Sequence, residues 1–299
     1  MPEPSRKGWR RPLFSALGAL LDLVFRSGSW GSAQRTGRRI GRLAWRLSRR
    51  DRARSLDHLA LAFPERSGEE RTALAQASFE HYGTMLGEAF WLRHRGADDL
   101  AQVVELVGWE RIEAARIAGR PILILTGHCG NWELLAAALN SRGLEMAVVA
   151  RELDDPGLQE MLLTLRSRYG TRTIVRGTPG AARLLLSKLR TGGALGMLID
   201  QDTRVDGVFV PFFGRPAYTP VGAAELALRF DAVVLPTFIE RLADGTHRAT
   251  IEPELRLPLD STAATALMTE AIETQIRRVP EQWVWLHRRW RRQPVESPM

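Results

Sequence analysis

The residues best suited to chemistry in this chain lie in one short segment, Gly127-His-Cys-Gly-Asn-Trp-Glu133, which follows an apolar run. An imidazole can take a proton near neutral pH, and a carboxylate can hold one of its nitrogens while the other accepts that proton. On a continuous helix, the spacing of His128 and Glu133 would separate them by about 140°. With His128 in a turn and Glu133 in the first turn of a helix, the chain could fold back and bring the two into contact. They would then form the base and its orienting partner of a catalytic triad, with a substrate hydroxyl replacing the serine.

Neighbouring residues add to this interpretation or compete with it. Backbone N–H groups around Gly130 and Asn131 could stabilise an oxyanion. Alternatively, Glu133 could be only a capping acid favoured by the helix dipole, with Gly130 as N-cap and His128 a polar loop residue. Cys129 could be a nucleophile, although the side chains of adjacent residues usually diverge. A phosphate-binding loop is disfavoured because neither GxGxxG nor GK[ST] occurs.

The elements that must position this segment alternate between strand and helix patterns. Strands are predicted over 103–107, 122–125, 146–150, 173–175, 194–199 and 232–238, with a candidate edge strand over 247–251. Helices are predicted over 55–63, 67–92 after the capping box Ser67/Glu70, 109–118, 132–140, 156–168, 179–191, 219–230 and 261–279. This alternation predicts an α/β fold with a mostly parallel central sheet covered by helices. In such sheets, sites form at the carboxyl ends of strands, which is where His128 lies.

Composition and charge indicate a globular protein with a basic N-terminal segment. Apolar residues make up 44% and charged residues 25%, which excludes global disorder. The single cysteine excludes a disulfide framework, and the histidines lack paired metal-ligand spacing, so we expect no metal. Residues 1–54 carry 14 Lys and Arg against 3 Asp and Glu, whereas the rest carries 28 against 31. We therefore expect a basic membrane-anchoring arm over 1–54 and a main domain over 55–299.

The pattern of the arm favours an anionic membrane surface as its partner. Apolar residues over 13–25 recur at helical spacing, but the run is shorter than the roughly 20 residues that a bilayer span needs. With cationic flanks, and with Trp9 and Trp30 at its ends, it predicts an amphipathic membrane-associated helix. The alternatives are a helix packed on the body, a tilted span and a cleaved signal peptide. The arginine-rich stretch 35–54 predicts a basic amphipathic helix, and no recognised nucleic-acid motif follows it, so we expect no nucleic acid.

The segment 127–133 resembles the H-x4-[DE] motif of glycerolipid acyltransferases, in the GHxGNWE form of the lipid A biosynthesis acyltransferase family. Further segments follow in family order: 62–65 resembles its AFPE signature, 200–202 its DQD stretch, 207–219 its GVFVPFFGxPAxT segment and 285–290 its WxHRRW run. The resemblance covers roughly residues 55–292. Cys129 replaces a common Phe, and 203–206 replaces an aromatic-glycine continuation. Both departures bear on the choice of acyl chain or acceptor.

The resemblance implies an O-acyltransferase at the cytoplasmic face of a bacterial inner membrane. His128 would be the general base and Glu133 its orienting partner. The acyl thioester of acyl carrier protein or coenzyme A would be a co-substrate, with no bound cofactor, and the acceptor a hydroxyl of a lipid A precursor. The alternatives are an acyl-coenzyme A-dependent enzyme for another glycolipid, such as a phosphatidylinositol mannoside, and a non-enzymatic basic membrane-binding protein.

The resemblance also implies that two arginines serve the site. Arg151 follows a strand and Arg166 lies on the next helix, and each guanidinium would pair with phosphate on the acceptor or the donor. Arg166 could instead lie on a solvated helix face. Asp200 and Asp202 end a strand, where they could bind substrate, cap a helix or pair with an arginine.

Aromatic and hydroxyl residues nearer the C-terminus complete the candidate binding residues. Phe213 and Gly214 could form an acyl-chain wall and a tight turn, or Phe213 could belong to the core. Thr219 could contact substrate or cap the next helix. Trp283 and Trp285, together with Trp290, suit either a headgroup interface or the core.

Overall fold

The computed structural model describes residue 25 and residues 28–153 and 155–294. The helix expected over 13–25 therefore lies outside the described residues, except for Phe25, whose buried ring stacks on Phe90 with 5.6 Å between centroids. Among the helices of the described residues, none combines the length and the apolar character that crossing a membrane requires.

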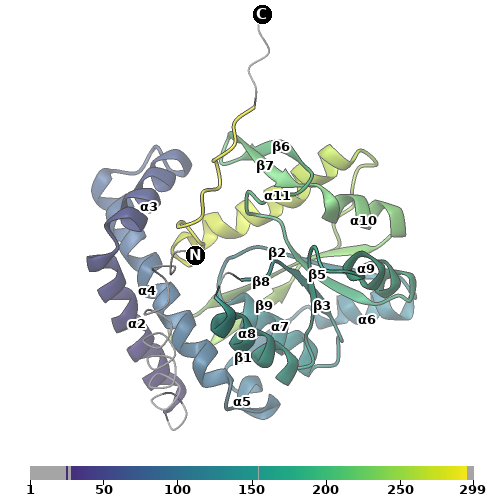
Figure 1. Cartoon of the computed structure of the whole chain (residues 1–299), viewed down its shortest axis with the longest axis horizontal. Coiled ribbons are helices and arrows are strands. Elements are labelled where there is room, and N and C mark those ends of the chain that lie inside the picture. The colour runs from purple at the N-terminus through teal and green to yellow at the C-terminus, as the bar shows by residue number, and fades with distance from the viewer. Residues whose placement is uncertain (1–24, 26–27, 154, 295–299) are drawn as a thin grey trace, which may run out of the picture.

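A seven-stranded sheet forms the centre of the molecule (Figure 1). Its spatial order is β1 (Val104–Val107), β9 (His247–Ile251), β8 (Val233–Arg241), β2 (Ile122–Thr126), β5 (Ala194–Leu198), β3 (Ala147–Ala150) and β4 (Arg172–Val175). Neighbouring strands are parallel except β8 and β9, so the predicted mostly parallel sheet is confirmed. The prediction that 247–251 forms an edge strand is wrong. It pairs with β8 on one side and with β1 on the other, a pairing between residues too distant in sequence for local patterns to indicate.

Helices cover both faces of this sheet. They are α2 (Trp30–Leu47), α3 (Arg49–Ala62), α4 (Gly68–Leu92), α5 (Ala97–Ala101), α6 (Trp109–Ile117), α7 (Trp132–Ser141), α8 (Pro156–Arg168), α9 (Ala181–Arg190), α10 (Gly222–Phe230) and α11 (Ser261–Arg278), followed by a 3-10 turn, Pro280–Gln282. In β2, Ile122 and Ile124 face a core that includes α4, α6 and α7 residues, whereas Leu123 and Leu125 face one that includes α10 and α11 residues. The predicted capping box is present at the start of α4.

The basic stretch 35–54 folds as two helices that break at Ser48, rather than as one. α2 lies against α4 at close range, since a Cβ on Gly37 would come 2.2 Å from the carbonyl oxygen of Gly83 and one on Gly41 2.2 Å from that of Phe79. Only glycine permits this approach of two backbones. The arm from residue 30 onward is thus packed on the body (Figure 1), and the arginines of α2 are exposed.

A hairpin that the sequence patterns did not predict follows the sheet strands. β6 (Gly207–Phe212) and β7 (Arg215–Pro220) are antiparallel. Both turn residues have positive φ, 52° at Phe213 and 69° at Gly214, which is the geometry of a two-residue hairpin loop. The tight turn predicted at Gly214 is confirmed.

The C-terminal tryptophans belong to the core. Trp283 and Trp285 are 0% exposed and Trp290 is 8% exposed. The rings of Trp283 and Trp285 meet edge to face, with 4.7 Å between centroids. Their alternative placement at a headgroup interface is therefore wrong.

Candidate active site

His128 lies in the loop that joins β2 to α7. Because β2 is the middle strand of the sheet, this loop lies at the centre of the sheet's carboxyl edge. β2 pairs with β5 so that Thr126 lies opposite Leu198, which places His128 and Asp200 two residues beyond the same paired position. The two strands are parallel, so both side chains leave the sheet at its carboxyl edge. The register of β2 and β5 therefore brings together two residues that are 72 positions apart.

Asp200 holds the imidazole of His128. Its Oδ1 lies 2.8 Å from Nδ1, and its Oδ2 accepts from the His128 backbone N–H at 2.8 Å and from Trp283 Nε1 at 2.7 Å. The Asp200 side chain is 0% exposed and that of His128 22% exposed. Burial alone would raise the pKa of Asp200, but the neighbouring His128 and the three hydrogen bonds hold it well below its usual range. Because Nδ1 is engaged, Nε2 is the nitrogen that can take a proton from a substrate.

Glu133 binds Arg166 rather than His128. The guanidinium donates from Nη2 to Oε1 at 2.6 Å and from Nε to Oε2 at 2.8 Å, and both side chains are largely buried. The predicted contact between Glu133 and the imidazole is therefore wrong, because Asp200 fills Nδ1 and α7 directs Glu133 toward α8. The alternative of a solvated Arg166 is also wrong. The capping alternative fails in its detail, since the N-cap of α7 is Asn131 and not Gly130.

Of the two residues expected to supply backbone donors in this loop, only Gly130 has its N–H engaged within the protein. The N–H of Gly130 donates to the carbonyl of Gln282 at 2.9 Å, so it is not available to an oxyanion. In the described part of the chain, the N–H groups of Asn131, Trp132 and Glu133 have no hydrogen-bond partner, as befits the N-cap and first residues of a helix. The positive end of α7, which begins a few residues after His128, therefore offers unpaired donors for a developing negative charge.

Two glycines allow the loop to pack this tightly. Gly130 has φ +65°, and a Cβ there would come 1.8 Å from the Ile239 carbonyl oxygen. A Cβ on Gly127 would lie 3.2 Å from Asp200 Oδ2. Any side chain at Gly130 would push the loop away from the sheet and separate His128 from Asp200.

Cys129 is buried between these residues. Burial, with a smaller contribution from Asp200, raises the pKa of its thiol well above the usual range. A thiol that stays protonated is a poor nucleophile. This geometry favours the imidazole over the thiol as the reactive group of the loop.

Several predicted binding residues instead make buried contacts within the protein. Asn131 accepts from Leu134 N–H and donates to Glu88. Asp202 accepts from Arg291 Nη2 at 2.9 Å and from Arg292 N–H at 3.1 Å, which confirms the arginine-pairing alternative. These side chains anchor chain segments and are not directed to an open surface.

The remaining predicted residues divide between core and surface. Phe213 is buried against Phe63 and Trp285, as the core alternative predicted. Thr219 is fully buried, donates to the Ala217 carbonyl and accepts from Arg289 Nη2, so it neither caps α10 nor faces solvent. Arg151 is exposed and directly follows β3, at the same edge of the sheet as His128. Gly214 forms the tip of the hairpin.

The residues that brace the His128–Asp200 pair were not identified as site residues from the sequence. Trp283 donates to Asp200, while Tyr82 donates to the Trp283 carbonyl and accepts from Trp285 N–H. Burial lowers the pKa of His287 to about 4, and its neutral Nε2 accepts from Asp202 N–H at 3.0 Å. The aromatic C-terminal run and its WxHRRW signature could have drawn attention to Trp283 and His287, whereas no local signal marks Tyr82.

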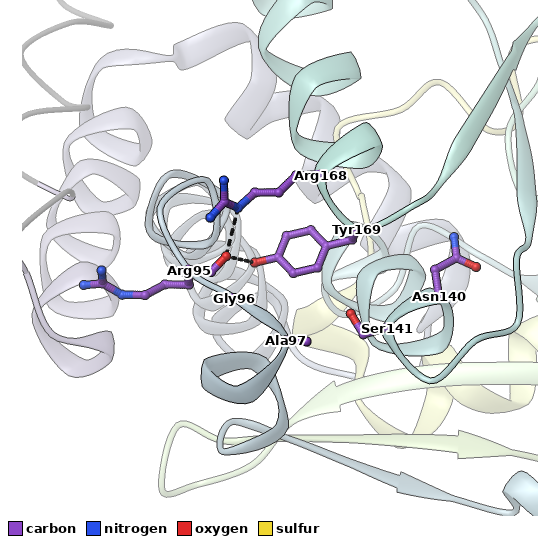
Figure 2. A pocket seen from close by; sticks show the side chains of 7 residues that line it. All are labelled: Arg95, Gly96, Ala97, Asn140, Ser141, Arg168 and Tyr169. Carbon is purple, nitrogen blue, oxygen red and sulfur yellow. Dashed lines mark hydrogen bonds between the residues drawn. The ribbon is translucent and has the colours of Figure 1, made fainter.

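Hollows on the surface lie away from this pair. One of about 460 Å³ is lined by Arg95, Gly96, Ala97, Asn140, Ser141, Arg168 and Tyr169 (Figure 2). There Tyr169 Oη and Arg168 Nε both donate to the Arg95 carbonyl, tying the end of α8 to the end of α4. A second of about 610 Å³ lies between the β6–β7 hairpin and α11. Within the described residues, no group of His, Cys, Asp or Glu is arranged to hold a metal ion.

Comparison with known proteins places this geometry in a family. The sequence model of the family described as bacterial lipid A biosynthesis acyltransferase matches residues 15–292. The lipid A biosynthesis myristoyltransferase of Escherichia coli (strain K12) is 30% identical over 83% of this chain and 77% of its own length. The lipid A biosynthesis lauroyltransferase of the same strain is 30% identical over 88% and 87%. A phosphatidylinositol mannoside acyltransferase of Mycobacterium tuberculosis (strain CDC 1551 / Oshkosh) is 28% identical over 72% and 69%. The match spans the sheet, the His128 loop and the C-terminal run, and the chain therefore belongs to the bacterial lipid A biosynthesis acyltransferase family and is an acyltransferase.

Proposed function

We propose that this protein transfers a fatty acyl chain from acyl carrier protein to a hydroxyl of a lipid A precursor at the cytoplasmic face of the inner membrane. The observation that carries the proposal is the His128–Asp200 pair, in which a buried carboxylate binds Nδ1 of a partly exposed imidazole. Such a pair can activate a hydroxyl without an enzyme nucleophile. Membership of the acyltransferase family supplies the reaction class.

In the proposed reaction, His128 Nε2 removes the proton from the acceptor hydroxyl as its oxygen attacks the thioester carbon. Asp200 stabilises the imidazolium that forms. The N–H groups at the start of α7 stabilise the negative charge on the former carbonyl oxygen. The tetrahedral intermediate then expels the carrier thiolate, which takes the proton from the imidazolium, and an ester remains on the acceptor.

Arg166 is positioned for a different task. Glu133 engages two of its nitrogens, which fixes the plane of the guanidinium next to the first turn of α7. We assign Arg166 to binding a phosphate of the acceptor or of the donor's prosthetic group, with Arg151 at the same edge as a second candidate. Glu133 then acts on catalysis through Arg166 and not through His128.

Replacing Glu133 by glutamine tests this division of roles. Glu133→Gln leaves Arg166 without its carboxylate, so we expect a loss of about 1–3 kcal/mol in the free energy of unfolding. The acid limb of the pH–rate profile should stay in place, because the partner of His128 is Asp200. Urea unfolding and the pH–rate profile are measured on one purified preparation, with Arg166→Gln completing a double-mutant cycle. If the acid limb of the pH–rate profile moves to lower pH in Glu133→Gln, Glu133 and not Asp200 would be the residue that orients His128.

The proposed membrane contact uses the exposed side of α2. This side carries arginines together with Leu43 and Leu47, which are 54% and 71% exposed. Cationic and apolar side chains on one helix face suit an anionic lipid surface. Each basic residue near such a surface contributes about 1 kcal/mol to binding. The packing of α2 on α4 would then hold the whole body close to the membrane.

Acidic substitutions on α2 should weaken this contact. We expect Leu43→Asp with Leu47→Asp to reduce sedimentation with phosphatidylglycerol-containing vesicles severalfold, because each change removes apolar area and adds repulsion. Leu184→Asp, at an exposed leucine of α9, is the matched control and should bind like the parent. Equal binding of all three proteins would assign the membrane contact to another surface.

Mass spectrometry of the lipid product tests the proposed reaction directly. Purified full-length protein is incubated with a lipid A precursor in detergent and with either acyl carrier protein or coenzyme A thioesters. We expect a mass gain of one acyl chain with the carrier-protein donor. Acylation of a phosphatidylinositol mannoside from acyl-coenzyme A instead would favour the activity named for the mycobacterial relative. The absence of any acyl ester with either pair would overturn both.

A further inference from the structure

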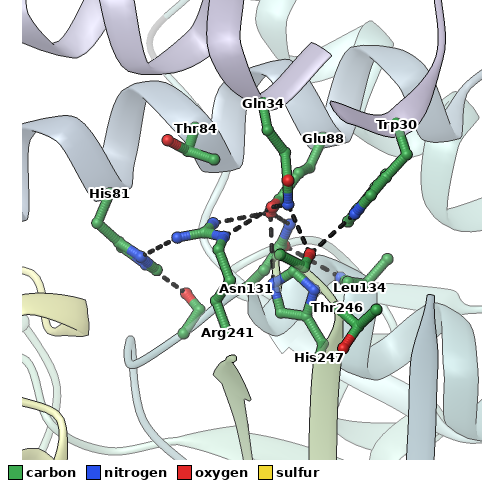
Figure 3. A network of polar contacts seen from close by, with 12 residues as sticks. Trp30, Gln34, His81, Thr84, Glu88, Asn131, Leu134, Arg241, Thr246 and His247 are labelled. Atoms are coloured by element: carbon green, nitrogen blue, oxygen red, sulfur yellow. Dashed lines mark hydrogen bonds and ion pairs between the residues drawn. The ribbon is translucent and has the colours of Figure 1, made fainter. Parts of the chain in front are cut away.

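A buried ionic cluster lies against the loop that carries His128 (Figure 3). We call it the Glu88 cluster, and its members are Gln34 of α2, His81 and Glu88 of α4, Asn131 at the N-cap of α7 and Arg241 of β8. The Glu88 carboxylate, 0% exposed, accepts from Arg241 Nε at 2.8 Å and Nη2 at 2.9 Å. It also accepts from Gln34 Nε2 at 2.8 Å and Asn131 Nδ2 at 2.9 Å.

This cluster keeps its charge inside the protein. Burial alone would raise the pKa of Glu88, but its interactions with His247 and Arg241 lower it to about 2. Burial also lowers the pKa of His247 to about 4, so at neutral pH the pair that remains charged is Glu88 and Arg241. Desolvating two charges is costly, and replacing a buried ion pair by well-packed apolar residues is often neutral or stabilising. The location of the cluster therefore points to a requirement for precise geometry.

The cluster holds two consecutive residues of the loop. Arg241 Nη1 lies 2.6 Å from His81 Nδ1, and since a guanidinium only donates, Nδ1 accepts and Nε2 carries the proton. His81 Nε2 then donates to the Gly130 carbonyl at 3.3 Å. Asn131 is held by its amide on Glu88, while its oxygen caps α7 through Leu134 N–H. The backbone is thus fixed two and three residues after His128, at the start of the helix whose N–H groups face the site.

The same carboxylate is tied to helix α2. Gln34 Nε2 donates both to Glu88 and to the Gly245 carbonyl, at 2.8 and 2.7 Å. Trp30 Nε1 donates to the same carbonyl at 2.8 Å. The Glu88 carboxylate and Gln34 together therefore connect the arm, the turn before β9 and the loop that carries the base (Figure 3).

We infer that the Glu88 cluster positions the His128 loop for acyl transfer. Through Gln34, helix α2 contributes to fixing the conformation of this loop. Glu88, His81 and Asn131 are positioning residues, because their contacts fix the backbone at Gly130 and Asn131 and do not touch the imidazole. The kinetic part of this inference rests on the proposed function. Its structural part, the dependence of the His128–Asp200 contact on Glu88, does not.

Paired glutamate substitutions on α4 test the cluster. In Glu88→Gln we expect kcat to fall by about 10-fold to 100-fold, because small displacements of catalytic groups carry losses of that order. KM for the acyl donor should stay within about twofold, since the donor does not contact the cluster. The matched control is Glu80→Gln, whose carboxylate pairs with Arg42 at 2.9 Å and also joins α4 to α2, but on the surface. It should retain the parental kcat.

Exchanging the charged and neutral side chains at positions 88 and 131 tests the positioning role even if Glu88→Gln alone does not fold. Asn131→Asp places a second carboxylate against Glu88 while keeping a good N-cap, so we expect kcat to fall as in Glu88→Gln. Combining it with Glu88→Gln restores one carboxylate and one amide facing each other, and with them the single negative charge of the cluster. The double variant should recover most of the lost kcat. A folded double variant that stays as impaired as Asn131→Asp would overturn the inference.

A spectroscopic readout separates this inference from the proposed reaction. In 15N-histidine-labelled full-length protein, the downfield proton of the His128–Asp200 bond, assigned by its loss in Asp200→Asn, reports the loop geometry without turnover. It should shift or vanish in Asn131→Asp, return in the double variant and stay unchanged in Glu80→Gln. An unchanged resonance in Asn131→Asp would overturn the positioning role even in an active enzyme. Protein that transfers no acyl group but shows this pattern would refute the proposed function alone.

Discussion

His128→Ala should leave a folded protein whose acyl transfer is slower by about 10²–10⁴-fold, the contribution typical of a positioned general base. The imidazole is the group that the loop presents to solvent, while Asp200 engages its other nitrogen. Alanine removes the base and leaves the fold intact, because the loop is held at Gly130 and Asn131 by separate contacts. Initial rates of ester formation and the circular dichroism spectrum of the same preparation check both statements.

Cys129→Ala is the control for this experiment. The thiol is buried and its raised pKa keeps it protonated, so its removal should cost stability but leave most of the turnover per folded molecule. If Cys129→Ala abolishes turnover and an acyl thioester on Cys129 can be trapped, the reaction is covalent. His128 would then serve the thiol and not the acceptor hydroxyl.

Local sequence patterns predicted most of the helices and strands, because the residues that define each of these elements are close together in the sequence. The apolar strand 122–125 and the capping box at Ser67 are complete within a few residues, so no distant partner is needed to recognise them. The position of β9 depends on pairing with β1, which lies far away in the chain. The hairpin β6–β7 was missed because its strand contains prolines and its turn uses Phe213 at positive φ, where Gly or Asn is the usual signal.

The candidate site shows the same division between local and distant information. His128 was identifiable because glycines surround it at the end of a strand. Its partner was misassigned to Glu133 because a spacing of five residues says nothing of a carboxylate on another strand. The useful signal was the position of Asp200, just past a second apolar strand, as His128 is past the first. Without the knowledge that β2 and β5 are neighbours, the two strand ends could not be joined.

Replacing Asp200 by asparagine should reduce acyl transfer by about 10²–10⁴-fold, and the reason lies in its hydrogen bonds. Oδ2 accepts from two N–H donors, the His128 backbone and Trp283 Nε1. In Asp200→Asn the amide oxygen must keep that position, so the amide NH₂ faces Nδ1. Nδ1 then has to accept, and the ring proton moves to Nε2, where it blocks removal of the substrate proton. The rate of ester formation, measured with protein of confirmed fold, checks this loss.

The pH dependence of the stability of the same variant provides a second, independent result. In the parent, the lowered pKa of Asp200 contributes stability that is present above about pH 4 and lost as the pH falls further. The loss of stability below about pH 4 should therefore be smaller in Asp200→Asn than in the parent. An Asp200→Asn protein with parental turnover would show that Asp200 holds the loop but does not serve the base, because Asn keeps both contacts at Oδ2.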